Sequence, residues 1–276
     1  MRIRDKIKKP QRPVVAYEIL PPREKDGTLN AYAETISSLL SQTHIDAINI
    51  PEVHDEVGRG ERPVSNQERG EPRKFGMLLQ DIVGIEAIVN RVVVHMPLKK
   101  QMEWIQETYS QFEIDNLVIV GGESSKQKYP GPTVNESLEK ISQDNRLREN
   151  SILCGGICIP SRRKESKNLI RKSECGAEFF TTQVLCDSDN IMKMIKNYQE
   201  RCDKVNTFPR RILLSFAPVS SQKNIDFLKW LGVEIPKDTE RYLNGRPGSM
   251  TERSLDVAIE VLNEILAFIT NNNLKV

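Results

Sequence analysis

The chain has 276 residues, of which 38% are hydrophobic and 28% are charged, a balance that excludes a chain disordered throughout and allows a sizeable buried core. The 40 Lys and Arg residues nearly equal the 38 Asp and Glu residues, and the formal net charge is +2. This balance points to neither nucleic acid nor an anionic membrane as the main partner, so we expect the protein to act on a small molecule.

Targeting and cysteine signals are weak. No apolar run approaches the roughly 20 residues that cross a bilayer. Residues 1–13 hold six basic side chains and no apolar segment follows them, so the chain lacks the pattern of a secretory signal and we expect a cytoplasmic protein. We interpret this basic arm as a solvated tail, with weak polyanion contact as the alternative. Five cysteines without a CxxC, and three histidines without ligand spacing, predict neither a disulfide framework nor a metal site.

Short β-branched runs alternate with amphipathic segments along the chain. The predicted strands are 14–20, 45–51, 91–97, 116–122, 151–160, 179–185 and 211–218. The predicted helices are 31–41, 77–90, 101–112, 134–144, 164–175, 190–201 and 251–269. The strands begin about 33 residues apart, the size of one βα unit. The pattern predicts an α/β fold with a single (β/α)8 TIM barrel domain over residues 1–276.

An open doubly wound sheet is the rival fold. It is disfavoured because Pro21, Pro22 and Arg23 follow the first strand, where a glycine-rich dinucleotide fingerprint would stand. Residues 52–76 are long, polar and rich in Gly and Pro, which predicts a surface loop or lid. After the helix 251–269 only 270–276 remain, so we expect an atypical or missing last strand, with the gap filled by a loop or a neighbouring subunit.

Polar residues stand at or after the carboxyl ends of five predicted strands, where barrel strands should be apolar. They are Glu18, Asn49, His95, Glu123 and Gln183. Each alone could satisfy a backbone group or a core partner. In a barrel, however, all these strand ends open on one face, so we expect the five side chains to converge on a site.

Within this set Glu18 is the best proton donor, because Ala16 and Leu20 flank it and Pro21 and Pro22 end the strand. Such a sheltered place favours the neutral carboxylic acid. Gly121 and Gly122 would let a flat ring approach the backbone beside Glu123; a tight turn is the alternative reading.

A further candidate is a basic helix face. Asn168, Arg171 and Lys172 are spaced i, i+3 and i+4 in a predicted helix, and together they could hold a phosphate or a ribityl chain. From the residues alone, a solvated basic face is the preferred reading.

Several of these motifs resemble those of the methylenetetrahydrofolate reductase family. They are the run Tyr17-Glu18-Ile19-Leu20-Pro21-Pro22-Arg23, the pair His95-Met96, the segment Asn168-Leu169-Ile170-Arg171-Lys172 with Cys175-Gly176-Ala177, the run Thr181-Thr182-Gln183 with Asp187, and the segments Phe216-Ala217-Pro218-Val219-Ser220 and Val233-Glu234-Ile235-Pro236. Together they span nearly the whole chain.

The resemblance implies a short, catalytic-domain form of a flavoenzyme that uses FAD to reduce 5,10-methylenetetrahydrofolate to 5-methyltetrahydrofolate, in one-carbon metabolism and methionine biosynthesis. It implies roles for single residues too. Glu18 and Glu123 would be catalytic, and Gln183 and Gln222 would bind substrate. The cofactor would contact Asn49, His95, Gly121, Gly122, Glu123, Asn168, Arg171 and Lys172.

The chain also departs from the family pattern. Gly121 and Glu123 stand where the family usually has Arg and Asp on either side of a glycine. Ile159 replaces a Tyr, and Gln222 stands where an aromatic residue often stacks on the nicotinamide. The electron donor is therefore NAD(P)H or another molecule. Two alternatives stay open: a reductase with a donor other than NAD(P)H, and a folate- or flavin-binding subunit of a larger complex. A homo-oligomer is compatible with each.

Overall fold

The structure, a computed structural model, describes residues 2–9, 12–54, 61–64, 68–122, 127–150 and 152–275. Contacts divide the chain into two compact units, which are described separately below. The first comprises residues 1–58, 67–156 and 174–179, and the second comprises 59–66, 157–173 and 180–276.

Seven strands form one sheet in the order of the sequence. They are β1 Ala16–Glu18, β2 Ala47–Ile50, β3 Ala87–Val92, β4 Asn116–Val120, β5 Leu153–Cys158, β6 Phe179–Val184 and β7 Arg211–Ser215. The pairs from β1·β2 to β4·β5 are parallel. This order is compatible with a (β/α)8 barrel that lacks its last strand, and in the described chain after β7, up to residue 275, no further strand follows.

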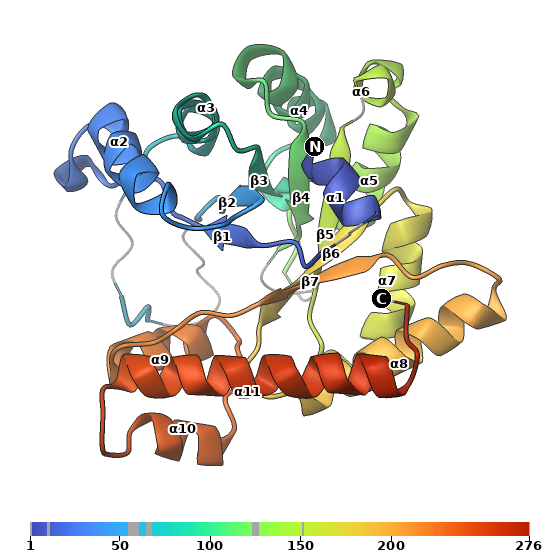
Figure 1. Cartoon of the computed structure of the whole chain (residues 1–276). Coiled ribbons are helices and arrows are strands. Elements are labelled where there is room, and N and C mark those ends of the chain that lie inside the picture. Colours follow the sequence, from blue (N-terminus) through green and yellow to red (C-terminus); the bar gives the residue numbers. More distant parts are fainter. Residues whose placement is uncertain are drawn as a thin grey trace. The chain divides into compact units, whose positions relative to one another are not determined.

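Helices separate the strands, as Figure 1 shows. The helices are α1 Ile3–Lys8, α2 Leu29–Leu40, α3 Pro72–Val83, α4 Leu98–Phe112, α5 Val134–Gln143, α6 Asn145–Glu149, α7 Glu165–Glu174, α8 Asp189–Lys204, α9 Gln222–Trp230, α10 Lys237–Leu243 and α11 Met250–Asn271, with 3-10 helices η1 Glu24–Asp26 and η2 Val93–His95. Each predicted helix overlaps an observed one, and α1, α6, α9 and α10 were not predicted. Within the described residues, no helix combines the length and the apolar character that a membrane span requires.

The boundary between α3 and β3 differs from the prediction. A helix was predicted over 77–90 and a strand over 91–97, but α3 ends at Val83 and β3 begins at Ala87. Gly84 ends the helix because its backbone adopts φ 71°, a left-handed conformation that suits glycine. His95 therefore lies beyond the strand, in η2. The predicted loop 52–76 is also too long, since α3 begins at Pro72; residues 55–60 and 65–67 lie outside the described part.

The prediction of a solvated amino-terminal tail is wrong. Residues 3–8 form helix α1, and Ile3 and Ile7 are 1% exposed. The two isoleucines are spaced i, i+4 and so share one face of the helix, which burial stabilises. Basic residues around them form ion pairs with acidic side chains.

Those partners share one position: each acid stands directly before a strand of the sheet. Asp46, Glu86, Asp115 and Glu178 precede β2, β3, β4 and β6. The ion pairs join Arg2 to Glu86 and Asp115, Arg4 and Lys8 to Glu178, and Lys6 and Arg12 to Asp46. The arm thus closes the amino ends of the strands, opposite to the ends where the candidate site residues lie.

Candidate functional site

Glu18 and Asn49 come together at the carboxyl ends of β1 and β2. The strand register places the two residues opposite each other, and Asn49 Nδ2 donates a hydrogen bond of 2.7 Å to Glu18 Oε2. Side chains of paired residues in parallel strands point to the same face of the sheet. The contact therefore joins two residues that the sequence placed at strand ends. In it, the Glu18 carboxylate accepts from one fixed donor, the Asn49 amide.

The surroundings of Glu18 differ in part from the prediction. All three residues of β1 are exposed, so the neighbouring residues do not seal the carboxyl group from solvent. Desolvation by nearby protein atoms still raises the pKa of Glu18, and the hydrogen bond from Asn49 partly opposes that shift.

His95 lies in a row of three rings. Its imidazole is tilted against that of His54, with ring centroids 4.6 Å apart, and it meets the edge of Tyr129 at 5.7 Å. Desolvation and the nearby positive charges of His54 and Arg91 lower the pKa of His95, while the charge of Glu52 raises it. The lower pKa keeps this imidazole neutral near pH 7.

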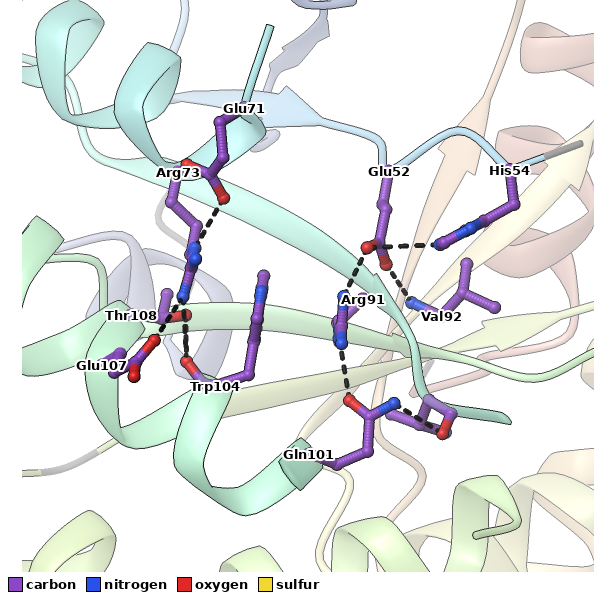
Figure 2. Close-up of polar contacts among 11 residues, drawn as sticks. Glu52, His54, Glu71, Arg73, Arg91, Val92, Gln101, Trp104, Glu107 and Thr108 are labelled. Carbon is purple, nitrogen blue, oxygen red and sulfur yellow. Dashed lines mark hydrogen bonds and ion pairs between the residues drawn. The ribbon is translucent and has the colours of Figure 1, made fainter. Parts of the chain in front are cut away.

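A buried ion pair supports this row. Glu52, two residues after the end of β2, pairs with Arg91 of β3. Its carboxylate also lies 3.2 Å from His54 Nε2 and accepts a hydrogen bond of 2.8 Å from the Val92 backbone N–H, as Figure 2 shows. Burial alone would raise the pKa of Glu52, but these partners hold it below its ordinary value.

The Arg91 guanidinium, only 4% exposed, is held from several sides. Its Nε donates to Gln101 Oε1 at 2.8 Å, and Gln101 Nε2 donates to the Val93 carbonyl at 2.8 Å. The guanidinium also lies 4.2 Å from the ring centroid of Trp104, whose other side meets Arg73 at 4.5 Å (Figure 2). Cation–π contacts and hydrogen bonds thus fix a charge that the sheet buries.

Sequence reasoning missed Glu52, His54 and Arg91. Glu52 was assigned to the polar loop 52–76, and Arg91 to the first position of a strand that in fact begins at Ala87. The usable signal was a charged side chain inside an apolar run, since Arg91 lies between Val89 and Val93 and a buried charge needs a partner.

The two glycines after β4 do not face open space. A side chain added at Gly122 would stand 2.4 Å from Cε2 and Cζ of Tyr129, so the Tyr129 ring already packs against this glycine. At Gly121 the nearest atom would be Val134 Cγ2 at 3.2 Å. Glu123, the second predicted acid, lies outside the described residues.

In the second unit, two side chains of the predicted basic face are bound by Glu165 of the same helix. The Lys172 ammonium lies 3.2 Å from Glu165 Oε1 and donates to the Ile157 carbonyl, and Asn168 Nδ2 donates to Glu165 Oε2 at 3.0 Å. Glu165 and Lys172 are buried, at 1% and 9% exposed. Arg171 is exposed. The three residues therefore do not present a shared cationic face.

The two predicted substrate-binding glutamines also have partners within the second unit. Gln183 of β6 donates to the Leu231 carbonyl at 3.2 Å, and its Oε1 accepts from the Val184 backbone N–H at 3.0 Å. Gln222 begins α9, where it donates to Asp226 at 2.8 Å and accepts from Asn244 at 2.8 Å. Their roles toward a substrate stay predictions.

Residues 158–274 match the family model described as methylenetetrahydrofolate reductase. No curated protein matches the chain.

Two solved structures are similar. The first, described as an uncharacterized protein from Clostridium thermocellum that binds two copies of 5-methyl-5,6,7,8-tetrahydrofolic acid, has a TM-score of 0.77 and 20% identity, and the alignment covers 98% of this chain and 88% of that one. The second, a putative racemase from Roseobacter denitrificans, is too distant to bear on fold or function, with a TM-score of 0.42, 10% identity and coverage of 81% and 53%. The match of residues 158–274 to this family model agrees with the resemblance found in the sequence, and the first protein shares the fold of this chain.

Proposed function

We propose that this protein binds a reduced folate and reduces 5,10-methylenetetrahydrofolate to 5-methyltetrahydrofolate, with Glu18 as the proton donor. The observation that carries the proposal is the contact between Glu18 and Asn49 at the carboxyl ends of β1 and β2. The family match supports an oxidoreductase of this class. Strand carboxyl ends are also where enzymes of this architecture place their chemistry.

The proton is needed before the hydride. The five-membered ring of methylenetetrahydrofolate opens when N10 is protonated, which breaks the bond between N10 and the methylene carbon and leaves an electrophilic iminium at N5. A carboxylic acid with a raised pKa keeps its proton closer to neutral pH and can transfer it to N10. Asn49 would hold the carboxyl group in one orientation throughout, because its amide donates to one oxygen and leaves the other for the substrate.

Folate as the ligand is supported by the protein from Clostridium thermocellum. That protein binds two copies of 5-methyltetrahydrofolic acid, which is the product of the proposed reaction. For this chain we propose the same class of ligand.

The resemblance also implied a bound FAD, and the residues assigned to it can be compared with the geometry. Gly122 is covered by the Tyr129 ring, His95 contacts His54 at a tilt and the edge of Tyr129, and the Lys172 ammonium is neutralised by Glu165. These residues do not fit a flavin cradle, so the proposed chemistry includes no step through FAD.

A folate-binding protein without turnover is the second candidate. It is favoured by one observation, since the neighbour that shares this fold is described by its binding alone. Two measurements separate the candidates. Titration calorimetry with 5-methyltetrahydrofolate detects binding in both cases, whereas formation of 5-methyltetrahydrofolate from methylenetetrahydrofolate, followed by mass spectrometry with a hydride donor present, occurs only for the reductase. Saturable binding without product would leave the binding protein, and absence of both would remove the proposal.

A further inference from the structure

We propose that the hydride comes directly from a dihydronicotinamide dinucleotide that binds and leaves in each turnover, and that no tightly bound flavin carries it. This inference rests on the proposed reduction of methylenetetrahydrofolate. It concerns the donor alone, so it can fail while that function stands.

The first observation is that Tyr129 occupies the face of Gly122. The ring atoms Cε2 and Cζ would lie 2.4 Å from a Cβ at that position, and the hydroxyl 2.7 Å. Contacts between carbon atoms are optimal at about 3.5–4.0 Å. The place where a flat isoalloxazine was expected to approach the backbone is therefore filled by a side chain of the protein.

The second observation is that the chain fixes Tyr129 in this place. Two residues later, the Gly131 N–H donates to the Val94 carbonyl at 2.8 Å. A Cβ at Gly131 would stand 2.4 Å from the Met96 carbonyl oxygen and 2.6 Å from that of Val93, so only glycine allows this approach to η2. The Tyr129 ring is thus held on the strand ends by its own segment and by the edge of His95.

The third observation is independent, because it lies entirely in the second unit. A flavin diphosphate needs cationic partners, but the Lys172 ammonium is bound by the buried Glu165 carboxylate and the Ile157 carbonyl. Turning Lys172 toward a diphosphate would break its contacts with Glu165 and the Ile157 carbonyl and would leave Arg162, 3.7 Å away, as the remaining cation beside Glu165. In each unit, therefore, a group that the resemblance assigned to the flavin is already in contact with the protein's own side chains.

The reaction balances without a flavin. Glu18 gives its proton to N10, and the bond between N10 and the methylene carbon breaks. C4 of the dihydronicotinamide then transfers a hydrogen with both electrons to the methylene carbon at N5, which becomes the methyl group. The oxidised nicotinamide leaves, and the Glu18 carboxylate takes a proton from water. One dihydronicotinamide and one proton are consumed for each methyl group formed.

Isotope transfer tests this donor. The full chain, purified without added FAD, would be given methylenetetrahydrofolate and NADH or NADPH deuterated at the transferable C4 position. We expect product with one deuterium in its methyl group, at a rate that added FAD does not change. A reduced flavin exchanges its N5 hydrogen with water, so turnover that requires FAD, or product that has lost the deuterium to solvent, would overturn the inference.

Two further measurements distinguish failure of this inference from failure of the proposed function. We expect titration of FAD with the protein to give no saturable quenching of flavin fluorescence; tight quenching, together with FAD-dependent product, would reject the direct donor and retain the proposed reduction. Protein that forms no methyltetrahydrofolate with NADH, NADPH or FAD-linked reduction would reject the proposed function, and this inference with it.

Discussion

Asn49 donates its side-chain amide to the Glu18 carboxylate at 2.7 Å, across two strands whose register sets the residues opposite each other. The geometry makes Asn49 the immediate control on the protonation of Glu18, because this hydrogen bond lowers a pKa that desolvation raises. The pair thus links the β1·β2 register to the acid strength of the proposed proton donor.

Removal of the amide should move the pH dependence of the reaction. In Asn49→Ala the opposing hydrogen bond is lost, so the pKa of Glu18 rises further. The proposed reaction needs the protonated acid, and its rate falls as pH rises through that pKa. We expect the alkaline limb of the kcat/KM profile to move to higher pH. An unchanged limb would show that Asn49 does not control this group.

Loss of the acid itself should be much more severe. Glu18→Gln keeps the size and a hydrogen-bonding oxygen but cannot give a proton, and general acid catalysis typically contributes about 10²–10⁴-fold. We expect kcat to fall within that range while 5-methyltetrahydrofolate still binds, as measured by calorimetry. Glu34→Gln, an exposed carboxylate on α2, is the control and should keep wild-type kcat. Equal rates in the two variants would remove Glu18 from the chemistry.

The strand ends that carry this site could be predicted from the sequence, whereas the contacts that support it could not. Proline after β1 and glycine after β4 mark strand ends locally, so Glu18 and Gly122 could be placed. The partner of Arg91 depends on how β2 and β3 are aligned, and the displaced start of β3 hid that relationship. The amino-terminal arm was predicted wrongly for a related reason. Its charges suggested a solvent-exposed tail, because their acidic partners are far away in the sequence, from Asp46 to Glu178.

Glu52 should stabilise the fold and adjust His95. In Glu52→Gln the buried Arg91 loses its counter-charge, which we expect to cost about 3 kcal/mol in the free energy of unfolding. The charge of Glu52 raises the pKa of His95, so that pKa should fall further in the variant, as followed by NMR. Glu52→Gln/Arg91→Met should recover much of the stability, and a double variant no more stable than the single one would contradict the ion pair.

The pH dependence of stability follows from the same carboxylate. The pKa of Glu52 is lowered in the folded protein, so its contribution is present above the unfolded pKa and is lost as pH falls through the folded one. Denaturation at pH 7 and at acid pH should therefore show a smaller difference for Glu52→Gln than for the wild type. An equal difference would mean that folding does not lower the pKa of Glu52.

Helix α1 should contribute through its buried face more than through its charges. Ile7→Ala removes a side chain that is 1% exposed, and such truncations cost about 2–5 kcal/mol. Lys9→Ala, just beyond the helix and exposed, should change the free energy of unfolding by less than about 0.5 kcal/mol. Similar urea midpoints for the two variants would restore the solvated tail that the sequence suggested.

Gly131 offers the sharpest structural check on the Tyr129 position. Gly131→Ala places a methyl group 2.4 Å from the Met96 carbonyl oxygen, and backbone atoms cannot turn aside as a side chain can. We expect a loss of about 1–3 kcal/mol, together with a shift in the His95 ring resonances as the edge of Tyr129 moves away. Gly121→Ala is the matched control, because its methyl group would meet only Val134 Cγ2 at 3.2 Å and that side chain can yield. If both variants melt at the same temperature with unchanged His95 resonances, then Gly131 does not hold Tyr129 over Gly122, and the space expected for a flat cofactor can open.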